Sequence, residues 1–244
     1  MKLLLSACII TAAATPLFAQ FDPPGITKAS KAYHAYRMVE TDPSYGLTKV
    51  ESLIKRIKAG SDDNEVMAAK TFNALSVPDK FTYCMMHGEE FSQNCNGMPA
   101  TLGEEKMIFG HPLGPWFEQN QWSDRQKSFL QKNRTAVVGL LRSTIRSNSR
   151  VGSNLKMAIA ELDAWELIPD LATSYNKAKR DGDILSVLFL LMKDGKFKPF
   201  LTSATYKKIY SDEDASYKSF VSYNSENAQL TIQRATAYYK SRNG

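Results

Sequence analysis

The sequence predicts an all-α fold in which antiparallel helix pairs carry one long irregular segment. Two observations support this prediction. Apolar residues recur at intervals of three and four along nearly every ordered-looking segment, and this spacing places them on one face of a helix rather than on alternate sides of a strand. Serine and proline stand where several of these segments begin, as expected at the N-termini of helices.

The N-terminal part contains four predicted helices. Three apolar stripes lie within residues 26–36, 47–57 and 64–75, and Thr41-Asp42-Pro43 ends the first of these segments. The fourth helix starts at Ser76-Val77-Pro78-Asp79, which has the form of a capping box with proline in the first turn. It carries Cys84 on its inward face and stops near Gly88.

The C-terminal part continues the helical pattern with clearer breaks. A capping box at Ser123–Gln126 opens a long helix that extends to Ile145, and "SNSRVGSN" ends it. Four further helices are predicted over residues 155–165, from Pro169, from Pro199 and over 225–240. Between them, "ILSVLFLLM" (184–192) is apolar on every side, which a helix tolerates only when neighbours bury it completely.

Residues 155–175, "LKMAIAELDAWELIPDLATSY", have the form of one helix pair, and the pattern repeats at an offset of thirty residues. The offset matches Leu155 with Leu185, Pro169 with Pro199, Leu171 with Leu201 and Lys177 with Lys207. Over roughly residues 123–210 the chain therefore resembles HEAT-like α-helical repeats. This resemblance implies a solenoid-like helix-pair array over residues 123–244 and a surface that binds macromolecules. An irregular helical domain explains the same periodicity.

The first nineteen residues have the layout of a secretory signal peptide, with a lysine, an apolar run and small residues before Ala19. Leu5-Ser6-Ala7-Cys8 leaves a lipoprotein signal as the alternative. No later apolar run reaches the length of about 18 residues that a membrane-spanning helix needs. We therefore expect residues 20–244 to form one exported α-helical domain, periplasmic or extracellular, with no transmembrane segment.

The net charge of +6 arises from 31 basic and 25 acidic residues. This moderate excess over a long chain does not indicate nucleic acid as a partner. It suits weak attraction to an anionic envelope polymer or an acidic protein.

Cys84 and Cys95 are the two cysteines that remain after the predicted cleavage, and in an oxidising compartment we expect them to form a disulfide. A zinc site is the alternative, because His87 and either Glu89 or Glu90 could complete four ligands. The disulfide is the preferred interpretation, so no metal is predicted.

Residues 92–122 are the irregular segment, and such long loops in compact domains are commonly functional. Its richest part, "IFGHPLGPWFEQNQW", contains His111, Trp116 and Trp122, which we predict as a binding surface because tryptophan anchors interfaces. The alternative is that the aromatic residues are buried and hold the segment on the helices.

The sequence contains no phosphate-binding glycine loop, no G-x-S-x-G motif and no H-E-x-x-H motif. His34, His87 and His111 are widely spaced, and each is expected to be a surface or capping residue. No catalytic residue and no cofactor is therefore predicted. The preferred function is a non-enzymatic exported binding or scaffold protein for a protein or envelope polymer. The alternative is a cell-envelope hydrolase, muramidase-like or peptidase-like, with its site under residues 93–122.

Overall fold

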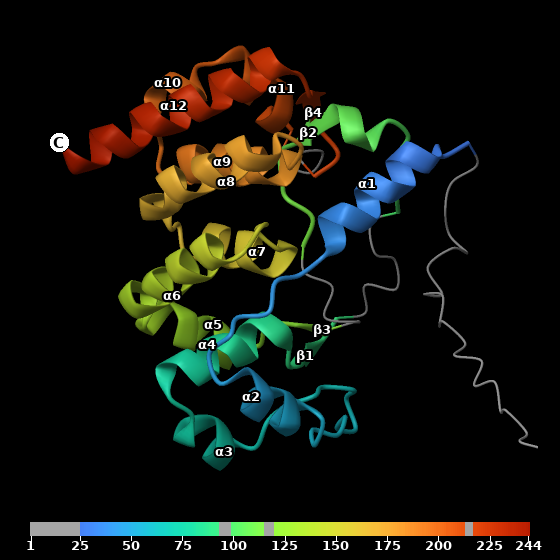
Figure 1. Ribbon diagram of the computed structural model, residues 1–244, viewed down its shortest axis with the longest axis vertical. Coiled ribbons are helices and arrows are strands. Elements are labelled where there is room, and N and C mark those ends of the chain that lie inside the picture. The colour runs from blue at the N-terminus through green and yellow to red at the C-terminus, as the bar shows by residue number, and fades with distance from the viewer. Residues whose placement is uncertain (1–24, 93–98, 115–119, 213–216) are drawn as a thin grey trace, which may run out of the picture.

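The computed structural model describes residues 25–92, 99–114, 120–212 and 217–244 (Figure 1). Within them the fold is mostly helical, with two small antiparallel sheets. The helices are α1 (Lys28–Met38), α2 (Leu47–Ile54), α3 (Ala69–Ala74), α4 (Val77–Met86), η2 (Glu104–Lys106), α5 (Asp124–Lys132), α6 (Arg134–Ser147), α7 (Ser153–Glu161), η3 (Trp165–Leu167), α8 (Ile168–Ala178), α9 (Gly182–Asp194), α10 (Lys198–Leu201), α11 (Ala204–Tyr210) and α12 (Ser225–Asn243). The prediction of a mainly helical fold is confirmed at this level.

The helices from α6 onward lie in successive layers, with α12 at one end of the molecule and α3 at the other (Figure 1). Helix α6 packs on α7, and α8 packs on α9. Contacts between α6 and α8 and between α7 and α9 join these two layers, and α12 covers both α8 and α9. Helix α1 lies at the side of the layers and packs against η2.

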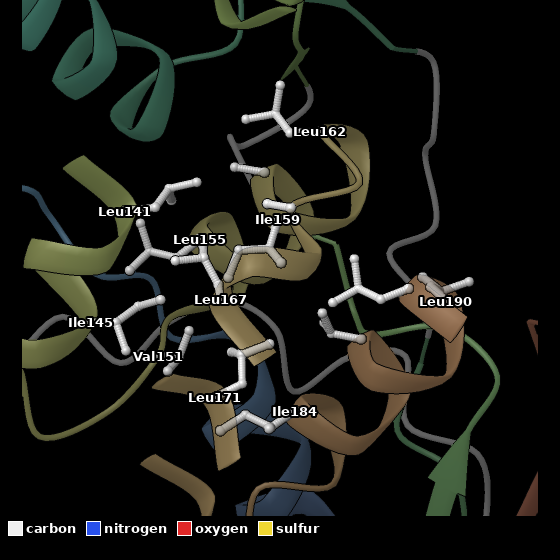
Figure 2. Close-up of a cluster of buried hydrophobic side chains, with 14 of the residues drawn as sticks. Leu141, Ile145, Val151, Leu155, Ile159, Leu162, Leu167, Leu171, Ile184 and Leu190 are labelled. Atoms are coloured by element: carbon white, nitrogen blue, oxygen red, sulfur yellow. The ribbon is translucent and has the colours of Figure 1, made fainter. Parts of the chain in front are cut away.

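Helix α9 is the centre of the core, and every residue from Gly182 to Met192 is buried. Figure 2 shows side chains of α6, α7, α8 and α9 gathered in one cluster, among them Leu141, Leu155, Leu171 and Ile184. Such a helix is stable only with neighbours on all sides. The prediction that residues 184–192 form a fully buried helix is confirmed.

The predicted helix starts at Ser76 and Ser123 are also confirmed. Ser76 Oγ accepts a hydrogen bond from the Asp79 backbone N–H at 3.2 Å. Ser123 forms a complete capping box with Gln126, which satisfies two backbone donors that the first turn would leave unpaired. Both serines fix where their helices begin.

The expectation of one long helix from Ser123 to Ile145 is wrong, because the chain leaves helical geometry at Asn133 and divides into α5 and α6. Asn133 Nδ2 donates to the Phe129 carbonyl at 2.9 Å, and asparagine competes in this way with the backbone bonds of a helix. Arg134 next to it donates to the Leu162 carbonyl at 2.9 Å. The break turns α6 toward α7.

Two other predicted helices are shorter than expected. Helix α3 begins at Ala69 rather than near Asn64, because the Asn64 side chain is engaged outside any helix and accepts from the Phe91 N–H at 2.6 Å. The helix expected from Pro199 is divided into α10 and α11. Ser203 caps the second of these, and its Oγ accepts from the Tyr206 N–H at 3.2 Å.

Short strands, which the sequence did not predict, tie the irregular segment to the rest of the molecule. Strand β1 (Glu90–Phe91) pairs with β3 (Asn120–Gln121), and β2 (Met107–Phe109) pairs with β4 (Phe220–Ser222). Both pairs are antiparallel, and Ile108 lies opposite Val221. Because β2 also packs against α9, residues next to it are held over the core.

The chain between α1 and α2 is held against the start of α7. Asn154 Oδ1 accepts from the Thr41 N–H at 3.0 Å, and its Nδ2 donates to the carbonyls of Thr41 and Met85 at 3.0 and 2.8 Å. A Cβ on Gly152 would lie 2.3 Å from Thr41 N, so this close approach requires glycine. In the part of the chain described here, no helix has the length and apolar character to cross a membrane.

Candidate functional site

A cavity of about 220 Å³ lies between α1 and the irregular segment. Most of its wall comes from the part of that segment between residues 99 and 114, and Met157 of α7 and Leu190 of α9 close the inner side. Phe109, Pro112 and Leu113 add further apolar surface. The polar groups that line it include those of His34, Arg37, Glu104 and His111.

Glu104 is the centre of the polar side and is almost completely buried. It accepts from His34 Nδ1 at 3.0 Å, from Arg37 Nη1 at 2.5 Å and from the Thr101 N–H at 2.9 Å. Burial alone would raise the pKa of Glu104, but the bond from His34, the charge of Arg37 and the Thr101 amide outweigh it. The pKa of Glu104 is therefore held below its usual range, and the group is a carboxylate at neutral pH.

This carboxylate determines how His34 presents its ring. Because Glu104 only accepts hydrogen bonds, the neutral imidazole of His34 carries its proton on Nδ1. Nε2 is then an acceptor, and no described residue donates to it. The side chain is 15% exposed and lines the cavity. His34 Nε2 is thus an oriented hydrogen-bond acceptor at the cavity, next to the hydrogen bonds that Glu104 accepts from His34, Arg37 and Thr101.

Arg37 is fixed by carboxylates at both ends of its guanidinium. Its Nε donates to the two Asp183 oxygens at 3.1 and 3.0 Å, and Nη2 donates to Asp183 Oδ1 at 2.9 Å, while Nη1 reaches Glu104. Burial would lower the pKa of Arg37, but Asp183 and Glu104 raise it above the usual value. The guanidinium also lies over the Phe109 ring, 4.5 Å from its centroid. Arg37 therefore joins α1, η2 and α9.

His111 also lines the cavity and is held by aromatic contacts. Its ring stacks on Tyr217 with centroids 4.0 Å apart, and it meets the edge of Tyr210 at 6.1 Å. The Tyr210 hydroxyl donates to the Gly110 carbonyl at 2.6 Å, which fixes the backbone next to His111. Of the three predicted binding residues, His111 is the one that the structure places at this cavity.

Of the other two predicted binding residues, only Trp122 is described by the structure, and it does not line the cavity. Trp116 lies outside the described residues. Trp122 is only 6% exposed and belongs to the hydrophobic core, and its Nε1 donates to the Cys84 carbonyl at 2.6 Å. This is the position of a residue that holds the segment on the helices, so Trp122 offers no surface to a partner in this conformation.

The predicted disulfide cannot be traced, because Cys95 lies outside the described residues, and it stays a prediction. Cys84 is a free thiol in the described part of the chain and is completely buried. Burial raises the pKa of this thiol far above its usual value. In its thiol form Cys84 is therefore protonated at neutral pH.

Glu89 and His87, two of the residues considered for a zinc site, have other polar partners. Glu89 accepts from the hydroxyls of Tyr83 and Ser123, both at 2.7 Å, and forms an ion pair with Arg125. His87 Nε2 lies 2.7 Å from the Glu65 carbonyl, and the ring is buried rather than at the surface. No group of three or more potential metal ligands is found among the residues that the structure describes.

The sequence did not link His34 with Glu104, because 70 residues separate them. His34 was expected to be a surface or capping residue, and Glu104 was not singled out. One local signal existed, since His34 and Arg37 are three residues apart and share a helix face. That spacing indicates a polar helix face, but it does not indicate which residues pack against it.

Comparison of the chain with protein families, with characterised proteins and with solved structures found no match.

Proposed function

We propose that this chain is an exported, non-enzymatic binding protein whose partner inserts one group into the cavity between α1 and residues 99–114. The partner is a protein or an envelope polymer. The observation that carries this proposal is the His34 acceptor, which is oriented by Glu104, faces an apolar cavity and has no donor among the described residues. Pockets that bind ligands commonly combine apolar walls with a few oriented polar groups.

The size of the cavity supports a single inserted group. Drug-sized ligands occupy pockets of about 300–1,000 Å³, whereas a dry cavity of roughly 150 Å³ takes one benzene ring. A volume of about 220 Å³ lies between these, close to the lower one. One side chain or one ring of a larger partner fits this space, and the surrounding loop contacts the rest of the partner.

The layers behind the cavity act as its frame in this proposal. The pairs α6–α7 and α8–α9, with α12 over the second pair, are consistent with a short HEAT-like array. Alternate helices contact each other across the layers, as they do when helix pairs stack. The array holds the irregular segment in place, and the predicted signal peptide over residues 1–19 delivers the protein to the envelope.

A blocked cavity tests the binding proposal. Leu113→Trp places a bulky ring on the half-buried loop wall, and Leu102→Trp is the matched control, since Leu102 lies in the same segment and is 58% exposed. We expect saturation binding to isolated cell-envelope fractions to fall at least tenfold for Leu113→Trp and to stay unchanged for Leu102→Trp. Thermal unfolding of both variants checks that the fold persists. Equal binding by the two variants would contradict the proposal.

A hydrolase is the second candidate, favoured by the His34–Glu104 pair. An imidazole whose Nδ1 is oriented by a carboxylate can remove a proton from water through Nε2, as a general base. Glu104 is ionised and already accepts several hydrogen bonds, so it suits the orienting role and not the acid role of a muramidase. Glu104 is also the one carboxylate among the described residues that line the cavity. A peptidase-like reaction is therefore the hydrolase that the site supports better.

Turnover distinguishes the two candidates. A hydrolase predicts release of peptide or ester products from envelope fractions, and a loss of about 10²–10⁴-fold in His34→Gln. The binding protein predicts no product from either the wild type or the variant. Product release that depends on His34 would replace the binding proposal by the hydrolase.

A further inference from the structure

The cavity selects its ligand by the groups that it leaves available. We propose that the bound group is a neutral phenolic ring, one six-membered aromatic ring whose hydroxyl donates a hydrogen bond to His34 Nε2. This inference rests on the proposed function, because it takes the cavity to be the binding site. It adds the chemical class of the ligand.

The first argument is that each described charged group at the cavity already has a partner. Arg37 is paired with Asp183 and Glu104, and Glu104 accepts from Arg37, His34 and the Thr101 amide. An anionic ligand would have to displace a buried carboxylate from Arg37, and a cationic ligand would have to displace Arg37 from Glu104. An anion would be buried beside two carboxylates that share one guanidinium, and a cation would find both oxygens of Glu104 already accepting hydrogen bonds, so either charge is unfavourable in this site. The site therefore favours a neutral ligand.

The second argument is the acceptor at His34. Among the described residues nothing donates to Nε2, and the ring is mostly buried. A ligand that excludes water from the cavity without donating to Nε2 leaves a buried acceptor unpaired. A hydroxyl group supplies the missing donor.

The third argument is the shape and chemistry of the walls. Phe109, Tyr217 and Met157 surround the space, and aromatic rings and thioether sulfur both pack favourably on an aromatic ligand. The volume of about 220 Å³ exceeds the roughly 150 Å³ that accepts benzene by enough for a hydroxyl and one small substituent. A single substituted ring fills the cavity, whereas two rings do not fit.

Phenolic chemistry has two sources, a free small phenol and the tyrosine side chain of a protein partner. Calorimetric titration of the full chain with 4-methylphenol and with N-acetyltyrosinamide compares them. 4-Methylanisole has the same ring without a donor, and 4-methylbenzoate has the same ring with a negative charge. We expect 4-methylphenol to bind at least tenfold more tightly than either control compound. Equal binding of N-acetyltyrosinamide assigns the ligand to a protein, and binding of 4-methylphenol alone assigns it to a small molecule.

Two variants locate the effect. His34→Leu removes the acceptor, and we expect it to bind 4-methylphenol and 4-methylanisole equally. Leu113→Trp should abolish binding of both. The inference is overturned if wild-type protein binds 4-methylanisole or 4-methylbenzoate as tightly as 4-methylphenol, or binds no ring while Leu113→Trp still blocks envelope binding. In those cases the proposed function stands. Envelope binding that is insensitive to Leu113→Trp contradicts the proposed function itself.

Discussion

Helices α12 and α1 both dock on α9 or on its first turn, but they use different chemistry. Helix α12 covers α9 with buried residues that include Ala228, Ala235 and Tyr238. Helix α1 buries only Ser30 and Arg37, and Arg37 reaches Asp183 of α9 through an ion pair. Apolar contact tolerates small shifts, whereas paired charges fix one geometry and lose much when one partner is removed. We call the contact between α12 and α9 the apolar junction and the contact between α1 and the start of α9 the polar junction. The apolar junction supplies stability, and the polar junction positions the cavity.

The largest expected effect is the loss of stability when apolar packing around α9 is removed. Phe189 of α9 is 1% exposed and stacks on Phe200 with centroids 5.5 Å apart. Phe189→Ala should lower the free energy of unfolding by about 3–5 kcal/mol, because it removes buried apolar surface and leaves a cavity. Urea denaturation followed by circular dichroism measures the loss. Leu230→Ala on the exposed part of α12 is the control and should change it by less than about 0.5 kcal/mol.

The second prediction concerns removal of the cation at the polar junction. Arg37→Met leaves the carboxylates of Glu104 and Asp183 buried without their cation, and should cost about 3 kcal/mol. The triple variant Arg37→Met, Glu104→Gln, Asp183→Asn removes the uncompensated charges together and should recover part of that loss. Urea denaturation of both variants decides the point. A triple variant less stable than Arg37→Met would show that the loss comes from packing and not from unpaired charge.

The third and smallest effect is the response of the polar junction to acid. The pKa of Glu104 is lowered in the folded protein, so its contribution to stability is complete above the ordinary carboxyl pKa of about 4.3 and is lost as the pH falls through the lower, folded value. Hydrogen exchange of α1 amides at decreasing pH should show loss of protection below about pH 4.3, while α12 amides stay protected.

The variant Glu104→Gln is the control for this acid response. The pKa of Glu89 is also lowered, so acid weakens the β1–α5 region in both proteins, and only the difference between them belongs to Glu104. We expect α1 protection in Glu104→Gln to depend less on pH than in the wild type. If the pH dependence of α1 protection were identical in the two proteins, Glu104 would not contribute to the acid response.

The two junctions also differ in how far the sequence could predict them. The segment 184–192, apolar apart from Ser186, predicts burial on every side, and the serines at 76 and 123 predict helix starts, because each signal lies within one turn or one helix. The strands could not be found in this way, since β1 and β3 contain two residues each and show no period. The break at Asn133 was not predicted either, because it depends on a side chain that competes with the backbone hydrogen bonds of its own helix.

The candidate site was less predictable still. His111 was predicted from its aromatic surroundings, and it lines the cavity. The roles of Glu104 and Arg37 follow only from their contacts with each other and with Asp183. Trp122 was assigned to a binding surface on residue type, and its burial against Cys84 depends on how the segment folds back. Local pattern identifies elements, whereas a site built between elements requires their arrangement.

The long separation between Arg37 and Asp183 has a consequence for the order of folding. The ion pair joins residues 146 positions apart, so it closes a large loop, and contacts of this separation form slowly because the chain entropy must be lost first. The helices from α6 to α9 assemble through neighbours in the chain and can form earlier. Helix α1 comes first in the described chain, yet Arg37 has no Asp183 partner until the start of α9 is in place. The contact of α1 with α9 therefore forms late, and the polar wall of the cavity is completed as a late event in folding.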